Sequence, residues 1–560
     1  MWLPTDVSGV RVVSFCPDRL IRLSNKSWLY SSEASVLKTD VMLSMMMMIM
    51  MLTEPGENRS VVRIRPLSLD FLCLGLGNLA VSQSSCFLQV ALGLIHASVF
   101  YLWQSTGLLD AKSRLDVSFK SFSDVSQTSP TPTDFLQLLS PYKSDLGPLV
   151  FEDFSELLTQ YEFQECSVDE FREQSRFILE YVWEKLHTGH WKDVPLCWRT
   201  VYAAVRLVRA LYVIARLKPS FPSDMQSMYL QRALEDLDYS LLMGHPVFEG
   251  LAAELAAVVH RGLSNLHGEH SLPNEDSPMI ACPMAGFPSV NPNLCPLNRV
   301  FRPSMEKFLA LMRVGQPFIL TGAMTHWPAC QSGSPHAWTV NYWRRCFGYR
   351  IVPVEIGRKY TDESWGQELM SITRFIDQFV STSSDSCDTK SQTPNPPIGY
   401  LAQHQLFLQI PELGYDVHTP DYCMVSGNES SDVSDVDINV WFGPANTVSP
   451  LHHDSDRANL LTQVNGYKYV VLFTASETPL VYPHPEKMLS NTSQVDVEHP
   501  DLANFPQFAL AQGFHGILGP GEMVFIPPRC WHYVRSLTTS FSVNFWWNVI
   551  DSLIPPWPHD

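Results

Sequence analysis

The second half of the chain constrains the fold most strongly, because short β-rich runs follow one another there from about residue 300. Turn-forming residues separate these runs, which are QPFILTG, RIVPVEIG, INVWFG, KYVVLF, EMVFIP and FSVNFWW. Repeated short strands of this kind are typical of an antiparallel barrel or sandwich. We therefore predict a β-rich domain at residues 298–547, followed by a C-terminal tail at 548–560.

A helical domain is predicted before it, at residues 136–264. In the segment WRTVYAAVRLVRALYVIARLK, apolar side chains recur at steps of four and three, which places them on one helix face. These side chains are Val201, Val205, Val208, Tyr212 and Ala215. Two further segments repeat the spacing, so we expect an all-α bundle whose arginines face solvent. Because the bundle shows no cluster of His, Cys or carboxylates, we expect it to dock a protein partner rather than to carry chemistry.

The remaining stretches are predicted to be linkers or to lack a native fold. Residues 118–135 and 265–297 are rich in Pro and Ser, as loops are. Residues 1–135 as a whole are expected to be disordered or non-native. They include a methionine-rich run at 42–52 and an apolar run at 87–103. The apolar run is shorter than the roughly 20 residues that a membrane helix requires, so we expect no membrane segment.

Composition narrows the classes of function. With 560 residues, of which 45% are hydrophobic, the chain can bury two cores, and it is expected to be a multidomain α+β protein. The net charge of -18 argues against a nucleic-acid-binding surface and favours basic peptide segments as partners. The 12 cysteines include no C-x-x-C pair, which favours the reduced cytosol or nucleus.

The stretch TVSPLHHD contains the pattern H-x-D. In a strand, residues two apart point to the same face, so His452 and Asp454 can converge while His453 faces away. A third ligand must come from a distant strand, and His532 follows a Gly-Pro-Gly turn and a predicted strand. Two histidines and one carboxylate form the facial triad of non-haem Fe(II) oxygenases. The sequence therefore predicts an iron site at His452, Asp454 and His532, whose donors also suit Zn, Mn or Ni.

Iron of this kind needs an electron source, and the commonest is 2-oxoglutarate, whose distal carboxylate requires a cation. Asn465-Gly466 is a strong hairpin signal, so the strands on either side of it are predicted to pair across a two-residue turn. On that register Lys468 shares a face with Asn459. If this face points inward, burying Lys468 is costly unless a carboxylate meets it. If it points outward, Lys468 is an ordinary surface residue, and the local sequence leaves both alternatives open.

Several motifs of the β-rich domain resemble the JmjC domain of Fe(II)- and 2-oxoglutarate-dependent oxygenases. They are RKYTDESW, GYLAQHQLF, WFGP, TVSPLHHD, NTSQVDVE, PGEMVFIP, CWHYVRSL and FSVNFWW, and VWEKLHTGHWKDV at 182–194 extends the likeness into the helical domain. The resemblance implies a double-stranded β-helix of the cupin, or jelly-roll, type. It also implies Fe(II), 2-oxoglutarate and O₂ as cofactor and co-substrates. The tail beyond Trp547 departs from the family pattern.

The resemblance also assigns residues to the co-substrate. Those that would bind 2-oxoglutarate are Tyr400, Ser449, Asn459, Lys468 and Trp546. The spacing from His452 to Lys468 is one residue longer than the family pattern. The odd spacing from Asp454 to Asn459 likewise requires residues 455–457 to bulge or turn, because strand parity would otherwise turn one of the two side chains away.

For a peptide substrate, the resemblance points to Glu355, Trp365, Gln403 and Trp441. Their chemistry fits a guanidinium, because a carboxylate accepts paired N–H donors and tryptophans stack on the planar cation. Taken singly, each has a structural alternative, such as a core tryptophan or an edge charge.

Within this family the chain resembles members described as protein-arginyl hydroxylases, histone lysine demethylases and peptidases. Arginyl hydroxylation is our leading hypothesis, although demethylation would use the same site. Metal-dependent proteolysis is a weaker alternative, since the sequence lacks the H-E-x-x-H helix of common metalloproteases and hydrolysis has no use for 2-oxoglutarate. A non-catalytic scaffold is disfavoured by the intact triad. The resemblance further implies a chromatin regulator, located in the nucleus or also in the cytoplasm, that acts on arginine-bearing proteins such as histone tails.

Overall fold

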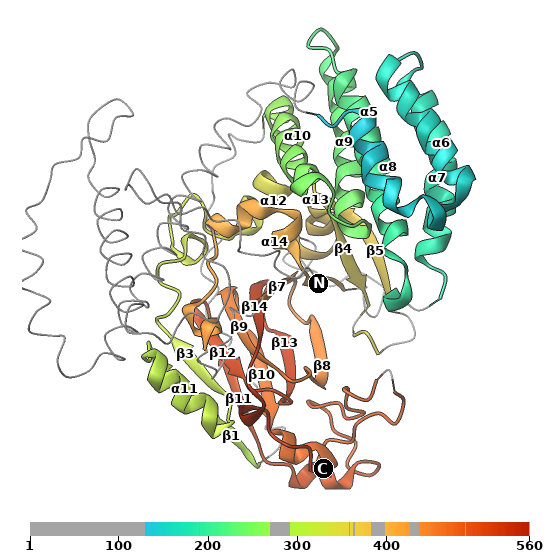
Figure 1. Cartoon of the computed structure of the whole chain (residues 1–560). Coiled ribbons are helices and arrows are strands. Elements are labelled where there is room, and N and C mark those ends of the chain that lie inside the picture. Colours follow the sequence, from blue (N-terminus) through green and yellow to red (C-terminus); the bar gives the residue numbers. More distant parts are fainter. Residues whose placement is uncertain are drawn as a thin grey trace, which may run out of the picture. The chain divides into compact units, whose positions relative to one another are not determined.

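The computed structural model describes a helical region followed by a β-rich region (Figure 1). The described residues are 129–189, 191–268, 292–357, 359–361, 365–381, 398–425, 436–487 and 489–558. The predicted α+β fold class is confirmed. The predictions for residues 1–128, including the apolar run at 87–103, lie outside the described residues. Within the described part of the chain, no helix is both long and apolar enough to cross a bilayer.

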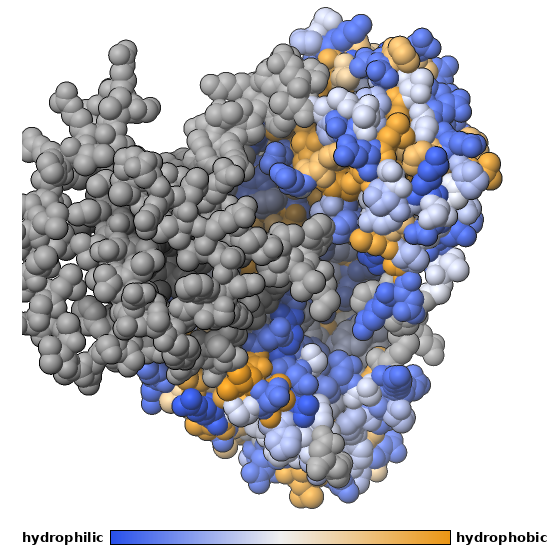
Figure 2. Space-filling model, in the orientation of Figure 1, coloured by the Kyte–Doolittle hydropathy of each residue, from blue (hydrophilic) through white to orange (hydrophobic). Residues whose placement is uncertain are grey.

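Six helices make up most of the described part of the helical region. They are α5 (Pro132–Leu139), α6 (Lys143–Phe163), α7 (Val168–Leu186), α8 (Leu196–Ala215), α9 (Ser223–Met243) and α10 (Leu251–His267). Helix α8 is central, because it packs against both α7 and α9 and is buried on nearly all sides. The predicted apolar face of α8 lies in this core. Figure 2 shows apolar side chains exposed among hydrophilic ones on this region. The large side chains exposed on its helices include Leu149, Phe163, Phe177, Tyr181 and Trp183.

The predicted solvent exposure of the α8 arginines is wrong for two of them. Arg206 donates a hydrogen bond to Asp236 of α9 at 2.7 Å, and Arg209 Nε lies 3.3 Å from the same carboxylate. Asp236 is fully buried and Arg209 nearly so. Because α8 is surrounded by other helices, these two arginines face α9 rather than open solvent, and burial of a charge requires an opposite charge.

Three predicted boundaries shift by a few residues. Helix α5 begins at Pro132, inside the predicted linker, because Thr131 and Asp134 form a capping box across its first turn. At the other end, α10 extends to His267, beyond the predicted limit of 264. Strand β1 (Leu294–Pro296) lies inside the second predicted linker, where it pairs with a strand of the β-rich domain.

The β-rich region consists of two sheets. The smaller sheet contains, in order, β1, β11 (Gly513–Leu518), β10 (Lys468–Phe473), β13 (Trp531–Ser536) and β8 (Val448–His453). The larger sheet contains β2 (Arg299–Phe301), β3 (Phe318–Thr321), β12 (Glu522–Ile526), β9 (Arg457–Asn465), β14 (Ser540–Asn548), β7 (Asp437–Gly443), β6 (Gly399–His404), β4 (Ile351–Ile356) and β5 (Gly366–Ser371). Neighbours are antiparallel except for β1 with β11 and β2 with β3. Short helices accompany the sheets: α11 (Met305–Val314), α12 (Val340–Phe347), α13 (Ile372–Phe375) and α14 (Leu406–Gln409).

The inner faces of the two sheets share one buried cluster. Leu461 of β9 and Val524 of β12 pack there with Val470 of β10 and Val534 of β13. Side chains of two facing sheets that interdigitate in this way form the core of a jelly roll. The strands of both sheets line the site described below.

The predicted hairpin at Asn465-Gly466 is wrong. Strand β9 pairs with β12 and β14, whereas β10 pairs with β11 and β13, so the turn carries the chain from one sheet to the other. Gly466 has φ +79, and a Cβ there would lie 2.1 Å from the Thr539 carbonyl oxygen, so this turn requires glycine. The chain does turn at Asn465-Gly466, as predicted. The two strands beside this turn do not pair with each other, because each pairs with strands farther along the chain.

Helix α9 is joined to the β-rich region by a buried ion pair. Asp238 of α9 accepts hydrogen bonds from Arg350 Nε and Nη2 at 2.9 and 2.8 Å, and from the backbone N–H of Ile351 at 2.7 Å. Gln409 of α14 donates to Asp238 at 2.8 Å and to the Ile351 carbonyl at 2.7 Å. Asp238 and Arg350 are both almost fully buried. This network fixes the start of β4, the strand whose other end carries Glu355.

Candidate metal and co-substrate site

The predicted metal ligands come together on neighbouring strands of the smaller sheet. His452 on β8 is directly opposite His532 on β13, and Asp454 follows the end of β8. One donor atom from each of the three residues lies within 4.8 Å of the others. His532 Nε2 is 3.8 Å from Asp454 Oδ2, and the two imidazole rings have centroids 4.2 Å apart. This donor set is the two-histidine, one-carboxylate arrangement that non-haem Fe(II) favours.

Backbone carbonyls orient both imidazoles. His452 Nδ1 lies 2.7 Å from the Pro450 carbonyl oxygen, and His532 Nδ1 lies 3.0 Å from the Cys530 carbonyl oxygen. A carbonyl only accepts, so each Nδ1–H donates and each Nε2 keeps its lone pair for a metal. Burial, and then the neighbouring His532, lower the pKa of His452 to about 4. Both effects favour the neutral imidazole that metals bind.

The carboxylate of Asp454 is held by two donors. Its Oδ2 accepts a hydrogen bond from Asn459 Nδ2 at 2.9 Å and another from Trp546 Nε1 at 3.0 Å. Burial by itself would raise the pKa of Asp454, but the two histidines and these hydrogen bonds lower it overall. Asn459 and Trp546 were assigned to 2-oxoglutarate by the resemblance. Their polar groups contact Asp454 in this structure.

The segment after His453 turns, as the odd spacing required. Residues 454–456 lie between β8 and β9 and belong to neither strand. The ring of His453 packs against Trp531, with centroids 4.7 Å apart, and His453 is not one of the converging donors. Asp456 forms an ion pair with Arg529. His452 and Asp454 thus converge and His453 does not, in agreement with the predicted separation, although Asp454 itself lies just past the end of β8.

Lys468 lies inside the barrel, so the inward alternative is confirmed. Its side chain is 1% exposed, and its Nζ donates to the Tyr400 hydroxyl at 3.1 Å. Among the residues that the structure describes, no carboxylate lies within ion-pair distance of Lys468. Burial lowers its pKa to about 7. A buried cation without a counter-ion is the environment that a carboxylate of a bound small molecule would stabilise.

The metal triad and Lys468 line the same inner cavity. Its walls also include Tyr400, Ser449, Asn459, Asn544 and Trp546. Burial raises the pKa of the Tyr400 hydroxyl, although the nearby hydroxyls of Thr447 and Ser449 act in the opposite direction. Since a cation, hydroxyls and open metal donors face one small space, these residues fit a dicarboxylate that also reaches the metal.

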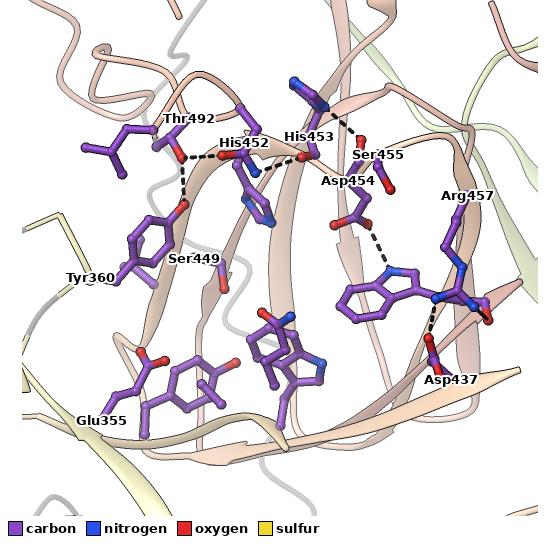
Figure 3. Close-up of a pocket in the computed structure, with 18 of the residues that line it drawn as sticks. Glu355, Tyr360, Asp437, Ser449, His452, His453, Asp454, Ser455, Arg457 and Thr492 are labelled. Atoms are coloured by element: carbon purple, nitrogen blue, oxygen red, sulfur yellow. Dashed lines mark hydrogen bonds and ion pairs between the residues drawn. The ribbon is translucent and has the colours of Figure 1, made fainter. Parts of the chain in front are cut away.

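An outer cavity of about 600 Å³ opens from this space, and the predicted substrate residues line it (Figure 3). Glu355 and Tyr360 lie across the cavity from Asp454 and Arg457 in this view. Trp365 Nε1 donates to Glu355 at 3.2 Å, and burial raises the pKa of Glu355 despite this hydrogen bond. A carboxylate of this kind is stabilised by an incoming cation.

Gln403 and Trp441 are the two remaining residues predicted to bind substrate, and the structure positions them differently. Gln403 has φ +46 at a register shift in β6, and such a bulge turns a side chain that regular pleating would direct elsewhere. Trp441 donates from Nε1 to Asn544 Oδ1 at 2.8 Å, and its ring lies 5.8 Å from that of Tyr400. Trp441 therefore lies where the outer cavity meets the inner one.

Sequence reasoning missed several residues of the site. The hydroxyls of Tyr360 and Thr492 lie 3.1 Å apart at the cavity wall, and Asn544 donates to Asn459 at 3.4 Å. All three belong to motifs that carried the resemblance. Asn544 had a local signal as well, because it lies two residues before Trp546 in one strand and shares its face. The structure thus brings every predicted site residue to one connected pair of cavities, while their roles stay predictions.

The sequence is similar to a known domain family and to several known proteins. Residues 305–552 match the family described as "Cupin-like domain". Over 391 residues the chain is 37% identical to "Lysine-specific demethylase 8" of Danio rerio, covering 69% of this chain and 90% of that protein. It is 34% identical to "Jumonji C domain-containing protein 5" of Drosophila melanogaster, covering 65% and 84% of the two chains. "Lysine-specific demethylase JMJ30" of Arabidopsis thaliana is 33% identical, with 66% and 84% covered.

Proposed function

Since this chain belongs to the JmjC family of cupin-fold oxygenases, we propose that it hydroxylates arginyl side chains of proteins, using Fe(II), 2-oxoglutarate and O₂. One observation carries the co-substrate part of this proposal. Lys468 is a buried cation with no carboxylate partner among the described residues, and it lines the same cavity as His452, Asp454 and His532. Hydrolysis would not require such a cation, whereas a dicarboxylate co-substrate would.

The proposal gives separate tasks to the metal triad, to Lys468 with Tyr400, and to Asn459 with Trp546. His452, Asp454 and His532 would hold the metal, and Lys468 with Tyr400 would bind the distal carboxylate of 2-oxoglutarate by charge-assisted hydrogen bonds. When bound, the metal and its co-substrates supply the oxidising power for C–H hydroxylation. Asn459 and Trp546 donate hydrogen bonds to the Asp454 carboxylate, so this metal ligand would keep its orientation when the metal binds.

The outer cavity supports an arginyl substrate. A guanidinium is planar and presents paired N–H donors, which suits the Glu355 carboxylate and the faces of Trp365 and Trp441. Gln403 adds a polar group to the same wall. Burial raises the pKa of Glu355 and a neighbouring positive charge would lower it again, so the cation and the carboxylate stabilise each other.

Demethylation of lysine is the second candidate, and the names of the relatives favour it. The same aromatic side chains and carboxylate also suit a methylated ammonium. Both candidates place a cationic side chain of a protein at Glu355, and both agree with the net charge of -18. We propose basic protein segments such as histone tails as substrates, in a nuclear setting, with the exposed apolar side chains of the helical region available to a partner.

Mass spectrometry separates these candidates. The full chain is incubated with Fe(II), 2-oxoglutarate and paired peptides that carry either arginine or methyl-lysine at one position. Hydroxylation adds one oxygen atom to the arginine peptide, requires 2-oxoglutarate, and is absent in His532→Ala. Loss of a methyl group with an unmodified arginine peptide would replace this proposal with demethylation. A cut backbone independent of 2-oxoglutarate would overturn both.

A further inference from the structure

The C-terminal segment 549–558 returns to the loop beside the candidate metal ligands. Val549 and Ile550 pack against the core of the larger sheet, and Leu553 is buried there. Beyond them, the ring of Trp557 lies 4.8 Å from that of His453 in an edge-on contact. The family match ends at residue 552, so Trp557 lies outside the range shared with the cupin-like domain.

Arg529 connects this segment to the bend after Asp454. Its Nε donates to Asp456 Oδ1 at 2.6 Å, and its Nη1 donates to the Pro555 carbonyl oxygen at 3.1 Å. Its backbone N–H donates to the Ser455 carbonyl oxygen at 3.2 Å. The guanidinium also lies over the ring of Trp557, 4.9 Å from its centroid. One side chain thus contacts the bend and the C-terminal segment at once.

These contacts matter because Asp454 lies outside any strand. The bend 454–456 has no ladder partners, so its contacts with Arg529 help to fix its path. Arg529 is also followed by Cys530, whose carbonyl orients the imidazole of His532. Arg529 therefore joins the segments that hold two of the three candidate ligands, and Trp557 covers it.

We propose that Trp557 and Arg529 are positioning residues that hold Asp454 and His532 at the separation a divalent metal requires. This inference rests on the proposed function. According to this proposal, the C-terminal segment supports the geometry of the metal site and is not dispensable for metal binding. Trp557 acts through its ring contacts with His453 and Arg529, and touches neither metal nor substrate. Groups that orient metal ligands typically change metal affinity by about 10- to 100-fold when they are removed.

The test measures the affinity of the full chain for Mn(II), from the EPR signal of the free ion. We expect Trp557→Ala to weaken binding by about tenfold and Trp557→Phe, which keeps an aromatic ring, to weaken it by less than about threefold. Trp183→Ala is the matched control, since Trp183 is a partly exposed tryptophan of α7 far in sequence from this loop, and its Mn(II) affinity should equal that of the wild type. Thermal unfolding is followed in parallel.

Arg529→Lys provides a second variant, in case Trp557→Ala does not fold. A lysine keeps the charge beside Asp456 but lacks the fork that reaches Pro555, so a loss of several-fold is expected. Equal Mn(II) affinity in the wild type and in every folded variant of Trp557 and Arg529 would overturn the proposed positioning role. An equal loss in Trp183→Ala would overturn it too. If the wild type itself bound no Mn(II), the proposed function would fail, which is a different result.

Discussion

Lys468 Nζ lies 3.1 Å from the hydroxyl oxygen of Tyr400, to which it donates a hydrogen bond inside the barrel. Neither side chain has appreciable access to solvent. This buried cation thus donates to a neutral hydroxyl, and burial lowers the pKa of Lys468 to about 7. The Lys468 ammonium would therefore be stabilised by a bound anion, and its charge depends on pH in the physiological range.

Binding of 2-oxoglutarate should therefore weaken as the pH rises. The co-substrate favours charged Lys468 and raises its pKa, so the complex holds more protons than the free protein above pH 7. We expect a constant Kd below about pH 7 and an increase approaching tenfold per pH unit above it, up to the pKa in the complex. Calorimetry with Mn(II)-loaded protein, without O₂, measures this dependence. In Lys468→Arg the slope should vanish, and an unchanged slope would exclude Lys468 as its source.

The two adjacent histidines should differ in metal binding. His452→Ala removes a converging donor and is expected to abolish measurable Mn(II) binding. His453→Ala should retain binding, weakened at most about tenfold, because its ring contacts Trp531 and Trp557 rather than the donor group. EPR titration measures the Mn(II) affinity of each variant and so shows which of the two histidines is a metal ligand. The opposite order would mean that the register of β8 is shifted by one residue.

Glu355→Gln should affect the peptide and spare the co-substrate. The variant keeps the shape and the contact with Trp365 but loses the charge that would meet a guanidinium. We expect KM for the arginine peptide to rise by about ten- to a hundredfold, equivalent to about 1.5–3 kcal/mol of a charged hydrogen bond. The Kd for 2-oxoglutarate should stay within about twofold of the wild type. A matching loss of both affinities would argue that Glu355 supports the fold of the cavity instead.

The buried pair of Asp238 and Arg350 should contribute strongly to stability. Asp238→Ala leaves the Arg350 guanidinium, the Ile351 N–H and the Gln409 amide without their shared acceptor. Removing one partner of such a pair typically lowers the free energy of unfolding by about 3–5 kcal/mol. Chemical denaturation measures the change. Asp169→Ala is the control, because Asp169 pairs with Arg232 at an exposed position, and a loss below about 1 kcal/mol is expected there.

Much of the fold and of the site followed from local patterns. Period-four and period-three spacing identified α8, and H-x-D parity separated His452 and Asp454 from His453. The odd spacing to Asn459 required the bend that the structure contains. By contrast, the solvent exposure predicted for Arg206 and Arg209 was wrong, because helical periodicity does not reveal how many neighbours surround a helix.

The sequence by itself determined the donor types, their faces on each strand, and the turn at Gly466, since these depend on residues within a few positions of one another. Only the tertiary structure decided which strands pair. It placed β9 and β10 in opposite sheets, so that Asn459 and Lys468 line one cavity from different sheets instead of sharing one face of a hairpin. It also brought Trp557 against His453. Contacts between distant segments depend on how whole sheets pack, and no local spacing encodes that packing.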